Sequence, residues 1–300
     1  MRETTVVDQI RKLTGPTPKG KGLIKGIGDD CAILRPRAKE DLVFTTDFVL
    51  EGRHFKLDTH SAADVGHKAL ARSLSDLAAM GSEPVFCLVS LAVPPHRNSQ
   101  WVQGFYRGLL ALAAQHDTVL AGGDLARFDS VLADVMCCGR VPQGRALLRS
   151  TAKPGDRIYV TGELGGSARG FATKRGKHWQ RHLRPEPRVG AGMALHRLRA
   201  SACMDLSDGL ALDLHRLCLE SHVSATLTGA LPIARGVSLD EALGGGEDYE
   251  LLFTAPAQAR IPAEITGLPI TCIGVITSGN PGKVQFNGRP LPIGGFDHFA

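Results

Sequence analysis

The chain has 300 residues, of which 43% are hydrophobic and 22% are charged, and its formal net charge is +5. This length allows one large hydrophobic core or two medium-sized ones. The charge is a mild basic excess without clusters that interleave Lys or Arg with aromatic residues, which argues against a nucleic-acid partner. No run of 18 apolar residues occurs, and the N-terminus lacks the apolar region of a signal peptide. We therefore expect a cytoplasmic protein without a membrane partner.

Four segments carry the pattern of amphipathic helices. The N-terminal segment 1–13 is the first of them. Residues 61–81 place apolar side chains at intervals near 3.6 residues, with Ser61 as a candidate N-cap. The pattern recurs at 98–117, and a further helix is expected to open at Ser207.

Short segments rich in Val, Ile and Thr and bounded by Gly or Pro predict strands among these helices. They are residues 41–50, 85–93, 130–141, 156–162 and 270–277. Strands mixed with helices predict an α/β (α+β) fold.

A basic segment marked by Pro and Gly separates two blocks that each contain strands and helices. We place the domain boundary within it, giving domains 1–148 and 149–300. The basic stretch 173–190 contains two prolines and is predicted to be a surface connection.

The seven cysteines are scattered and form no C-x-x-C pair, which predicts reduced, buried thiols instead of disulfides or a zinc site. They are Cys31, Cys87, Cys137, Cys138, Cys203, Cys218 and Cys272.

Several aspartates lie in or beside apolar segments instead of charged runs: Asp29, Asp30, Asp47, Asp76, Asp124, Asp205 and Asp208. Some have ordinary explanations when taken alone: a hydrogen-bonded core carboxylate for Asp76, a turn for Asp124, a helix-start acid for Asp208. A fold that gathers several buried carboxylates must neutralise them. Mg²⁺ does so with oxygen ligands, which Thr45 and Thr46 also offer. Cys and His ligands are missing from these segments, so Mg²⁺ is preferred over Zn²⁺.

Glycines supply backbone N–H groups that a phosphate can approach. Gly122 and Gly123 precede Asp124, and the segment 162–170 contains four glycines. Neither segment matches the Walker or Rossmann pattern, which disfavours a P-loop NTPase or an NAD enzyme. For 162–170, a plain tight turn and a phosphate-binding loop are about equally supported.

Eight motifs, in order, resemble those of the thiamine-monophosphate kinases of the aminoimidazole-ribonucleotide synthetase-like superfamily. They are GIGDDCAIL, TTDFVLEGRHF, GHKALARSLSDLAAMGSEP, AGGDLAR, GRALLRSTAKPGD, MDLSDGL, GGGEDYELLFT and GFDHFA, and they run from residue 26 to residue 300. The resemblance implies a Mg²⁺-dependent kinase that uses ATP to convert thiamine monophosphate to thiamine diphosphate. It also implies a two-domain PurM-like architecture. In it, domain 1–148 binds ATP and Mg²⁺ and forms a barrel-like homodimer interface, and domain 149–300 completes the nucleotide and substrate site.

The resemblance also assigns site residues. The implied metal ligands are Asp30, Thr45, Thr46, Asp47, Asp76, Asp124, Asp205 and Asp208. The implied nucleotide contacts are Tyr106, Gly123, Asp124, Arg149 and Ser207. The implied substrate contacts are His54, Glu247 and Phe296, the last standing where the family is expected to carry Tyr or Trp. No role is implied for Asp29.

The implied chemistry is direct in-line transfer of the γ-phosphoryl group, without a covalent or acid–base residue. Joining two phosphates requires positioning and cationic screening of charge, which metal ions held by Asp47 and Asp124 would supply. Arg149, His54 and Tyr106 have ordinary structural explanations, and only the resemblance assigns them a role.

Two alternatives remain open. One is another synthetase of the superfamily, acting on a formylglycinamidine ribonucleotide, selenide or a carbamoyl group. The other is a catalytically silent nucleotide-binding paralogue with a regulatory role. No Cys lies in the first 25 residues, which argues against selenophosphate synthesis, and every acidic motif position is occupied, which argues against a silent paralogue.

Overall fold

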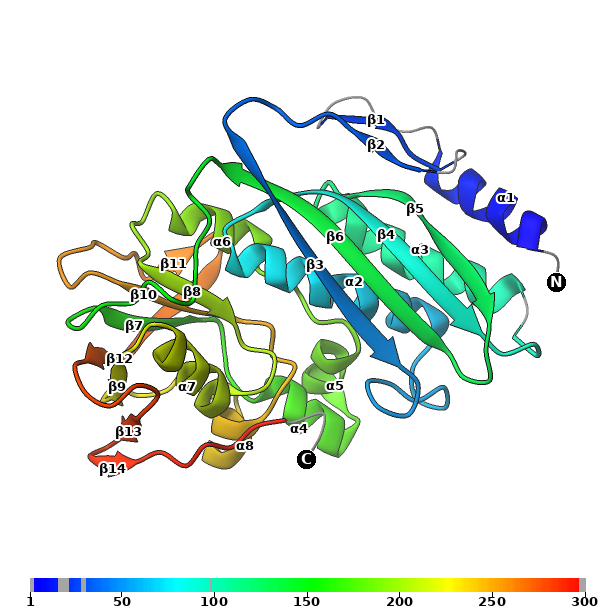
Figure 1. The fold of residues 1–300 in the computed structure, drawn as a ribbon. Coiled ribbons are helices and arrows are strands. Elements are labelled where there is room, and N and C mark those ends of the chain that lie inside the picture. The colour runs from blue at the N-terminus through cyan, green and yellow to red at the C-terminus, as the bar shows by residue number, and fades with distance from the viewer. Residues whose placement is uncertain (1–2, 16–21, 28–30, 98, 297–300) are drawn as a thin grey trace. The chain divides into compact units, whose positions relative to one another are not determined.

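The computed structural model describes residues 3–15, 22–27, 31–97 and 99–296, and the chain divides into two compact units (Figure 1). The first unit is Met1–Leu77 with Glu83–Gly144, and the second is Ala78–Ser82 with Arg145–Ala300. The chain therefore passes from one unit to the other three times.

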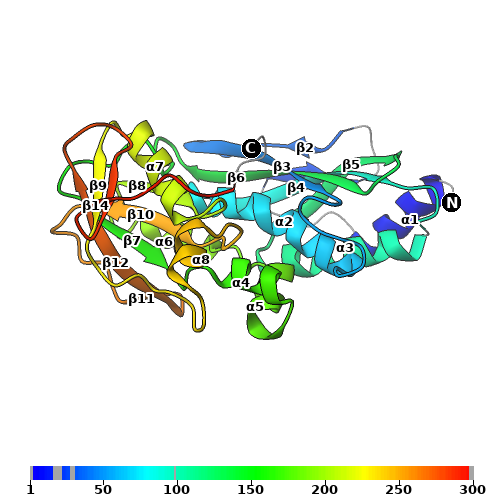
Figure 2. The same ribbon diagram turned by 90° about the horizontal axis from the view of Figure 1, so that it is seen from below.

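The first unit contains a two-stranded and a four-stranded sheet with three helices. Its elements are α1 (Glu3–Thr14), β1 (Leu23–Lys25), β2 (Ile33–Leu34), β3 (Glu40–Leu50), α2 (Ala62–Ala79, its last two residues in the second unit), β4 (Glu83–Val93), α3 (Ser99–Gln115), β5 (Val119–Arg127) and β6 (Leu132–Pro142). The four-stranded sheet has the order β3-β6-β4-β5, with β4 and β5 parallel and joined through α3. Figure 2 shows α2 and α3 on the same face of this sheet.

Strand alternation decides which side chains of β3 face these helices. Val49 is fully buried, whereas Phe44 and Phe48 are 59% and 54% exposed. Because successive side chains point to opposite faces, Thr45 and Asp47 share the face of Val49, and Thr46 lies on the face of the two exposed phenylalanines.

Glycines bring α2 and α3 into backbone contact. A Cβ atom on Gly66 would lie 1.9 Å from the Phe105 carbonyl oxygen, and one on Gly108 would lie 1.9 Å from the Ala63 carbonyl oxygen. Any larger residue would push the helices apart, so these glycines fix the helices that carry Asp76 and Tyr106.

The second unit is built on one eight-stranded sheet. Its strands are β7 (Arg157–Thr161), β8 (Ala202–Asp205), β9 (Ser224–Leu227), β10 (Leu251–Ala255), β11 (Glu264–Ile265), β12 (Leu268–Thr277), β13 (Val284–Phe286) and β14 (Arg289–Pro290). Its helices are α4 (Gly166–Thr173), α5 (Gly176–Leu183), α6 (Val189–Leu195), α7 (Leu210–Glu220) and α8 (Leu239–Gly244). The strand order is β14-β13-β9-β12-β7-β10-β8 with β11 on β12, and the buried core includes Ile158, Val160 and Leu214.

The segment Ala78–Ser82 is held by residues of the second unit. The Leu147 N–H donates to the Met80 carbonyl at 3.1 Å, and His196 Nε2 lies 3.0 Å from the Gly81 carbonyl oxygen. These contacts explain why the segment belongs to the second unit although its neighbours in sequence belong to the first.

Most of the predicted elements are confirmed. The predicted strands correspond to β3, β4, β6, β7 and β12, and the first three predicted helices to α1, α2 and α3. Ser61 caps α2, because its Oγ accepts the Asp64 N–H at 3.2 Å while its own N–H donates to the Asp64 carboxylate at 3.1 Å.

Two local predictions are wrong. The helix expected to open at Ser207 begins at Leu210, so Ser207 and Asp208 lie in the loop before it. The stretch 173–190 is not a plain surface connection, because it contains α5 and buries His182 and Leu183.

All seven cysteines are free thiols, but Cys31 and Cys272 are exposed and so depart from the prediction that all are buried. Within the described residues, none of the helices has the length and apolar character needed to cross a membrane.

Candidate active site

In the first unit, β3 and α2 bring two predicted carboxylates together. The Thr45 hydroxyl donates to the Asp76 carboxylate, and Arg72 Nη2 lies 3.1 Å from Asp47 Oδ1. Asp47 and Asp76 are themselves close enough for their side chains to hydrogen-bond. Burial raises the pKa of Asp47, and the Arg72 guanidinium opposes this rise.

This group suits a hard cation. Two carboxyl groups within hydrogen-bonding distance need a proton or a cation between them, and the Thr45 hydroxyl adds an oxygen donor. Arg72 had not been predicted. Its position four residues before Asp76 places both on one face of α2, which is a signal the sequence does contain.

The neighbouring Thr46 is separated from this group. Its hydroxyl donates to Asp134 of β6, on the opposite face of the sheet. The Thr46 side chain therefore lies away from Asp47 and Asp76, and its backbone carbonyl is its remaining oxygen ligand.

A pocket of about 600 Å³ in the first unit is lined by Tyr106, Gly123 and Asp124, together with mainly apolar side chains. Tyr106 is buried, and this burial raises its pKa above the ordinary value, with the Asp124 charge acting in the same direction. Gly123 has a φ of +149°, and a Cβ atom there would lie 1.9 Å from the Val89 carbonyl oxygen. The close approach of the β4 backbone therefore requires glycine at position 123, independently of any nucleotide contact.

His54 lies in the turn after β3 and is nearly buried. Its Nδ1 accepts the Leu50 N–H at 3.0 Å, and its carbonyl accepts the Lys68 ammonium at 3.3 Å. Since Nδ1 is an acceptor, the neutral imidazole carries its hydrogen on Nε2, which is buried.

In the second unit, backbone hydrogen bonds gather four predicted residues. The Glu247 N–H donates to the Ser207 carbonyl at 2.7 Å, and the Phe296 N–H donates to the Asp208 carbonyl at 3.0 Å. Segments far apart in the sequence therefore meet at the loop between β8 and α7.

Two residues absent from the predictions, Asp213 and Arg216, hold this loop. Asp213 Oδ2 accepts the N–H groups of Asp208 and Gly209, each at 3.0 Å, and Arg216 Nη1 pairs with Asp208. Burial raises the pKa of Asp213 to about 6, and the two N–H donors oppose that rise. Asp213 and Arg216 are three residues apart on α7, so helical spacing predicts that they pair with each other but not that they reach Asp208.

Asp205 and Arg149 each lie near Cys203. Asp205 is buried at the end of β8, whereas Arg149 is exposed. The charges of both act on the Cys203 thiol, whose pKa burial raises. Within the described part of the chain, no hydrogen bond or ion pair joins the Arg149 side chain to Ser207.

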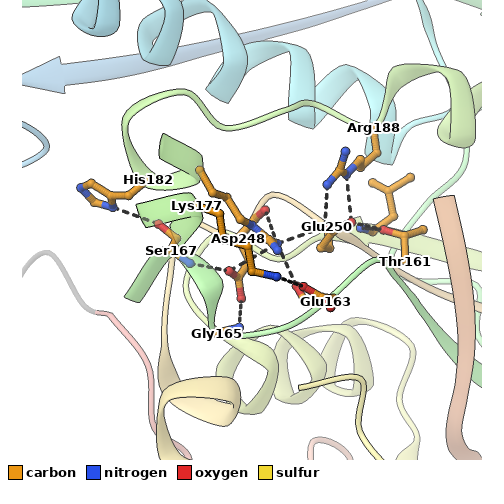
Figure 3. A network of polar contacts seen from close by, with 11 residues as sticks. Thr161, Glu163, Gly165, Ser167, Lys177, His182, Arg188, Asp248 and Glu250 are labelled. Carbon is orange, nitrogen blue, oxygen red and sulfur yellow. Dashed lines mark hydrogen bonds and ion pairs between the residues drawn. The ribbon is translucent and has the colours of Figure 1, made fainter. Parts of the chain in front are cut away.

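Figure 3 shows a buried network of carboxylates and arginines that the sequence predictions missed. The Glu250 side chain is fully buried, and Arg188 binds it through two hydrogen bonds of 2.9 and 2.7 Å. Arg181 adds a contact of 3.0 Å, and the Thr161 hydroxyl donates to Glu250 at 2.6 Å. These arginines come from the basic stretch 173–190.

The glycine-rich segment 162–170 now has a structural explanation. Asp248 accepts the N–H groups of Gly165 and Ser167 at the start of α4, at 2.5 and 3.1 Å. A carboxylate of the protein itself thus binds the N–H groups that a phosphate would need, which favours the turn over a phosphate-binding loop.

Two predicted positions and one general test concern the metal site. Asp29 and Asp30 lie outside the described residues. Among the residues the structure describes, no three His, Cys, Asp or Glu side chains form a group able to hold a metal ion. Mg²⁺ commonly takes only one or two carboxylates and completes its shell with water and substrate phosphate, which matches the pair formed by Asp47 and Asp76.

Comparison with known proteins identifies the family. The model described as AIR synthase related protein, N-terminal domain, matches residues 28–141, and the corresponding C-terminal domain model matches residues 153–287. A Salmonella typhimurium protein named thiamine-monophosphate kinase is 41% identical over 92% of each chain. The chain belongs to the thiamine-monophosphate kinase family.

Solved structures of this family share the fold. The crystal structure of the Stenotrophomonas maltophilia thiamine-monophosphate kinase matches with a TM-score of 0.85 and 38% identity, covering 97% of this chain and 98% of the other. The protein AaThiL, solved in complex with AMPPCP and TMP, matches with a TM-score of 0.79 and 30% identity over 100% and 99% of the two chains. The mixed α/β fold in two units is therefore that of the family.

Proposed function

We propose that this protein phosphorylates thiamine monophosphate to thiamine diphosphate, with ATP as the phosphoryl donor and Mg²⁺ as the cofactor. The backbone hydrogen bonds that gather Ser207, Asp208, Glu247 and Phe296 in one loop cluster support this function most directly. They unite implied nucleotide, metal and substrate residues that the sequence places in three separate motifs. The relatives named above, which match nearly the whole chain, support the same activity.

Mg²⁺ would be held by carboxylate and hydroxyl oxygens of this chain and by the backbone carbonyl oxygen of Thr46. In the first unit these are Asp30, Thr45, Thr46, Asp47, Asp76 and Asp124, and in the second Asp205 and Asp208. When bound, Mg²⁺ screens the charges of the two phosphate groups that must approach each other. The role of the chain is to hold these oxygens in fixed places, as Thr45 does for Asp76 and Asp213 for the backbone at Asp208.

The remaining residues would bind the organic parts of the substrates. The pocket beside Tyr106, Gly123 and Asp124 is apolar enough for a nucleotide base, and Arg149 and Ser207 are the further nucleotide contacts. His54 and Glu247 would contact thiamine monophosphate, and the ring of Phe296 would stack on its heterocycle. We expect transfer to be direct and in line, because none of the implied residues is placed as a covalent nucleophile.

The test is to incubate purified protein with ATP, Mg²⁺ and thiamine monophosphate and to follow thiamine diphosphate by chromatography. We expect stoichiometric formation of thiamine diphosphate and ADP, and loss of turnover on chelation of Mg²⁺. With ATP of defined chirality at the γ-phosphorus, we expect inversion of configuration. Product no greater than in the no-enzyme control would refute the function, and retention would refute the direct mechanism.

We also propose that the exposed face of the four-stranded sheet forms the barrel-like homodimer interface of the family. Phe44 and Phe48 are exposed on this face, where solvation of large apolar side chains is unfavourable. We expect the wild-type protein to sediment as a dimer and Phe48→Asp to shift the mass to that of a monomer. Phe171→Asp, at an equally exposed phenylalanine of the second unit, should leave the mass unchanged. A monomeric wild type would contradict the proposal.

A further inference from the structure

The run Glu247–Glu250 contains three carboxylates, and all three contact the segment formed by α4, α5 and the start of α6. Asp248 and Glu250 are buried, and they already bind backbone N–H groups of α4 and the Arg188 guanidinium, respectively. Glu247 differs, because its side chain is 22% exposed and lies 3.3 Å from His182 Nδ1 through Oε2. It is thus the carboxylate of the three that a substrate can reach.

The backbone of Glu247 is fixed before any substrate binds. Its φ is +62°, in the left-handed region that non-glycine residues rarely adopt. Its N–H is held by the Ser207 carbonyl at 2.7 Å. Only the side-chain torsions of Glu247 are left to decide where its carboxylate points.

His182 is itself tightly held. It is 5% exposed, and its Nδ1 lies 2.9 Å from the Ser167 hydroxyl oxygen (Figure 3). Its ring stacks on Trp179 at a centroid distance of 5.3 Å and an interplanar angle of 13°, and Phe171 lies against it at 5.3 Å. A side chain fixed on several sides can orient a more mobile neighbour.

We propose that His182 is a positioning residue that orients the Glu247 carboxylate toward the amino-bearing heterocycle of thiamine monophosphate. An ionised carboxylate only accepts hydrogen bonds, so His182 would stabilise it through a hydrogen on Nδ1 that is shared between Glu247 Oε2 at 3.3 Å and the Ser167 hydroxyl oxygen at 2.9 Å. The inference rests on the proposed function, in which Glu247 contacts the substrate, and it assigns a role to α5 within the basic stretch 173–190.

The test compares His182→Leu with His182→Asn in steady-state kinetics for both substrates. Because hydrogen bonds to charged groups are worth more than neutral ones, His182→Leu should raise KM for thiamine monophosphate about tenfold or more and leave KM for ATP unchanged. His182→Asn should restore most of the loss, since its amide nitrogen takes the place of Nδ1. The matched control is His178→Leu on the same helix, where the histidine Nε2 lies 3.0 Å from the Arg235 carbonyl oxygen, and no change is expected.

A double-mutant cycle separates positioning from a general structural effect. In a Glu247→Gln background, His182→Leu should add less than twofold to the dissociation constant for thiamine monophosphate, measured by calorimetry without ATP. If His182→Leu does not fold, Trp179→Leu, which removes only the stacked ring, should raise that constant several-fold. Suppose that the wild type turns over and the variants keep its KM and dissociation constant for thiamine monophosphate. That result, or full additivity of the two substitutions in the cycle, would overturn this inference alone. A wild type without turnover would overturn the proposed function as well.

Discussion

Replacing Asp47 by Asn is expected to lower kcat/KM for thiamine diphosphate formation by about 1,000-fold or more. The substitution removes a negative charge that would hold Mg²⁺ beside Asp76, and charge stabilisation of this kind accounts for the largest losses on mutation. The measurement is initial-rate kinetics at saturating Mg²⁺. The same loss is expected for Asp124→Asn, at an exposed position where the change should not disturb the fold.

Two controls make this result interpretable. Asp134→Asn alters the carboxylate on the other face of the sheet, bound to Thr46, and is expected to change kcat/KM by less than about tenfold. Asp47→Asn also removes the charged partner of Arg72. Thermal unfolding is therefore measured to show that the variant is folded. Full activity of a folded Asp47→Asn variant would remove Asp47 from the metal site, and the same outcome for Asp124→Asn would remove Asp124.

The largest effect on stability is expected for Glu250→Gln. Its carboxylate is fully buried and pairs with both Arg181 and Arg188, so the amide would remove the counter-charge of Arg188 and leave Arg181 with Asp248 alone, at 3.4 Å. Removing one partner of a buried ion pair costs about 3–5 kcal/mol of unfolding free energy. Chemical denaturation monitored by circular dichroism would measure this loss.

The matched control for Glu250→Gln is Glu163→Gln. Glu163 also pairs with a basic residue of this segment, Lys177, but at 3.8 Å and with side chains 50% and 66% exposed. Exposed pairs contribute little, so the change should stay below about 1 kcal/mol. Equal stability losses in the two variants would show that burial of Glu250 does not have the consequence we assign to it.

Local patterns predicted much of the fold. The helices α2 and α3 have apolar side chains at regular helical spacing, and β3, β4 and β6 are rich in β-branched and aromatic residues between turn signals. Such elements are decided by residues close together in the chain. The start of α7 was misplaced because Ser207 resembles an N-cap, whereas Gly209 occupies that position.

The basic stretch 173–190 could not be interpreted from its own composition. Arginines and prolines usually indicate solvent exposure, but Arg181 is neutralised by Glu250, which is 69 residues away in sequence. Nothing local reveals a pairing across that separation. The same limit applies to Asp134 beside Thr46, since the register of β3 on β6 follows from the folded sheet.

The candidate site shows the same division. Motif resemblance named Glu247 and Asp208 but not the residues that hold them, His182, Asp213 and Arg216. Residues that touch a substrate stand in distinctive motifs. Residues that orient them act through geometry, which becomes visible only when the chain is folded.

The segment Ala78–Ser82 limits how this protein can be divided. A cut near residue 148 would leave the second unit without Leu147 and without the segment Ala78–Ser82, which Leu147 and His196 bind. A cut before Ala78 would instead remove β4, β5 and β6 from the first unit. No single break keeps both units intact. One of two separately expressed fragments would therefore always lack a segment of its own unit. During synthesis, Ala78–Ser82 is made before Leu147 and His196. This segment therefore cannot form its contacts with them until the second unit has been synthesised.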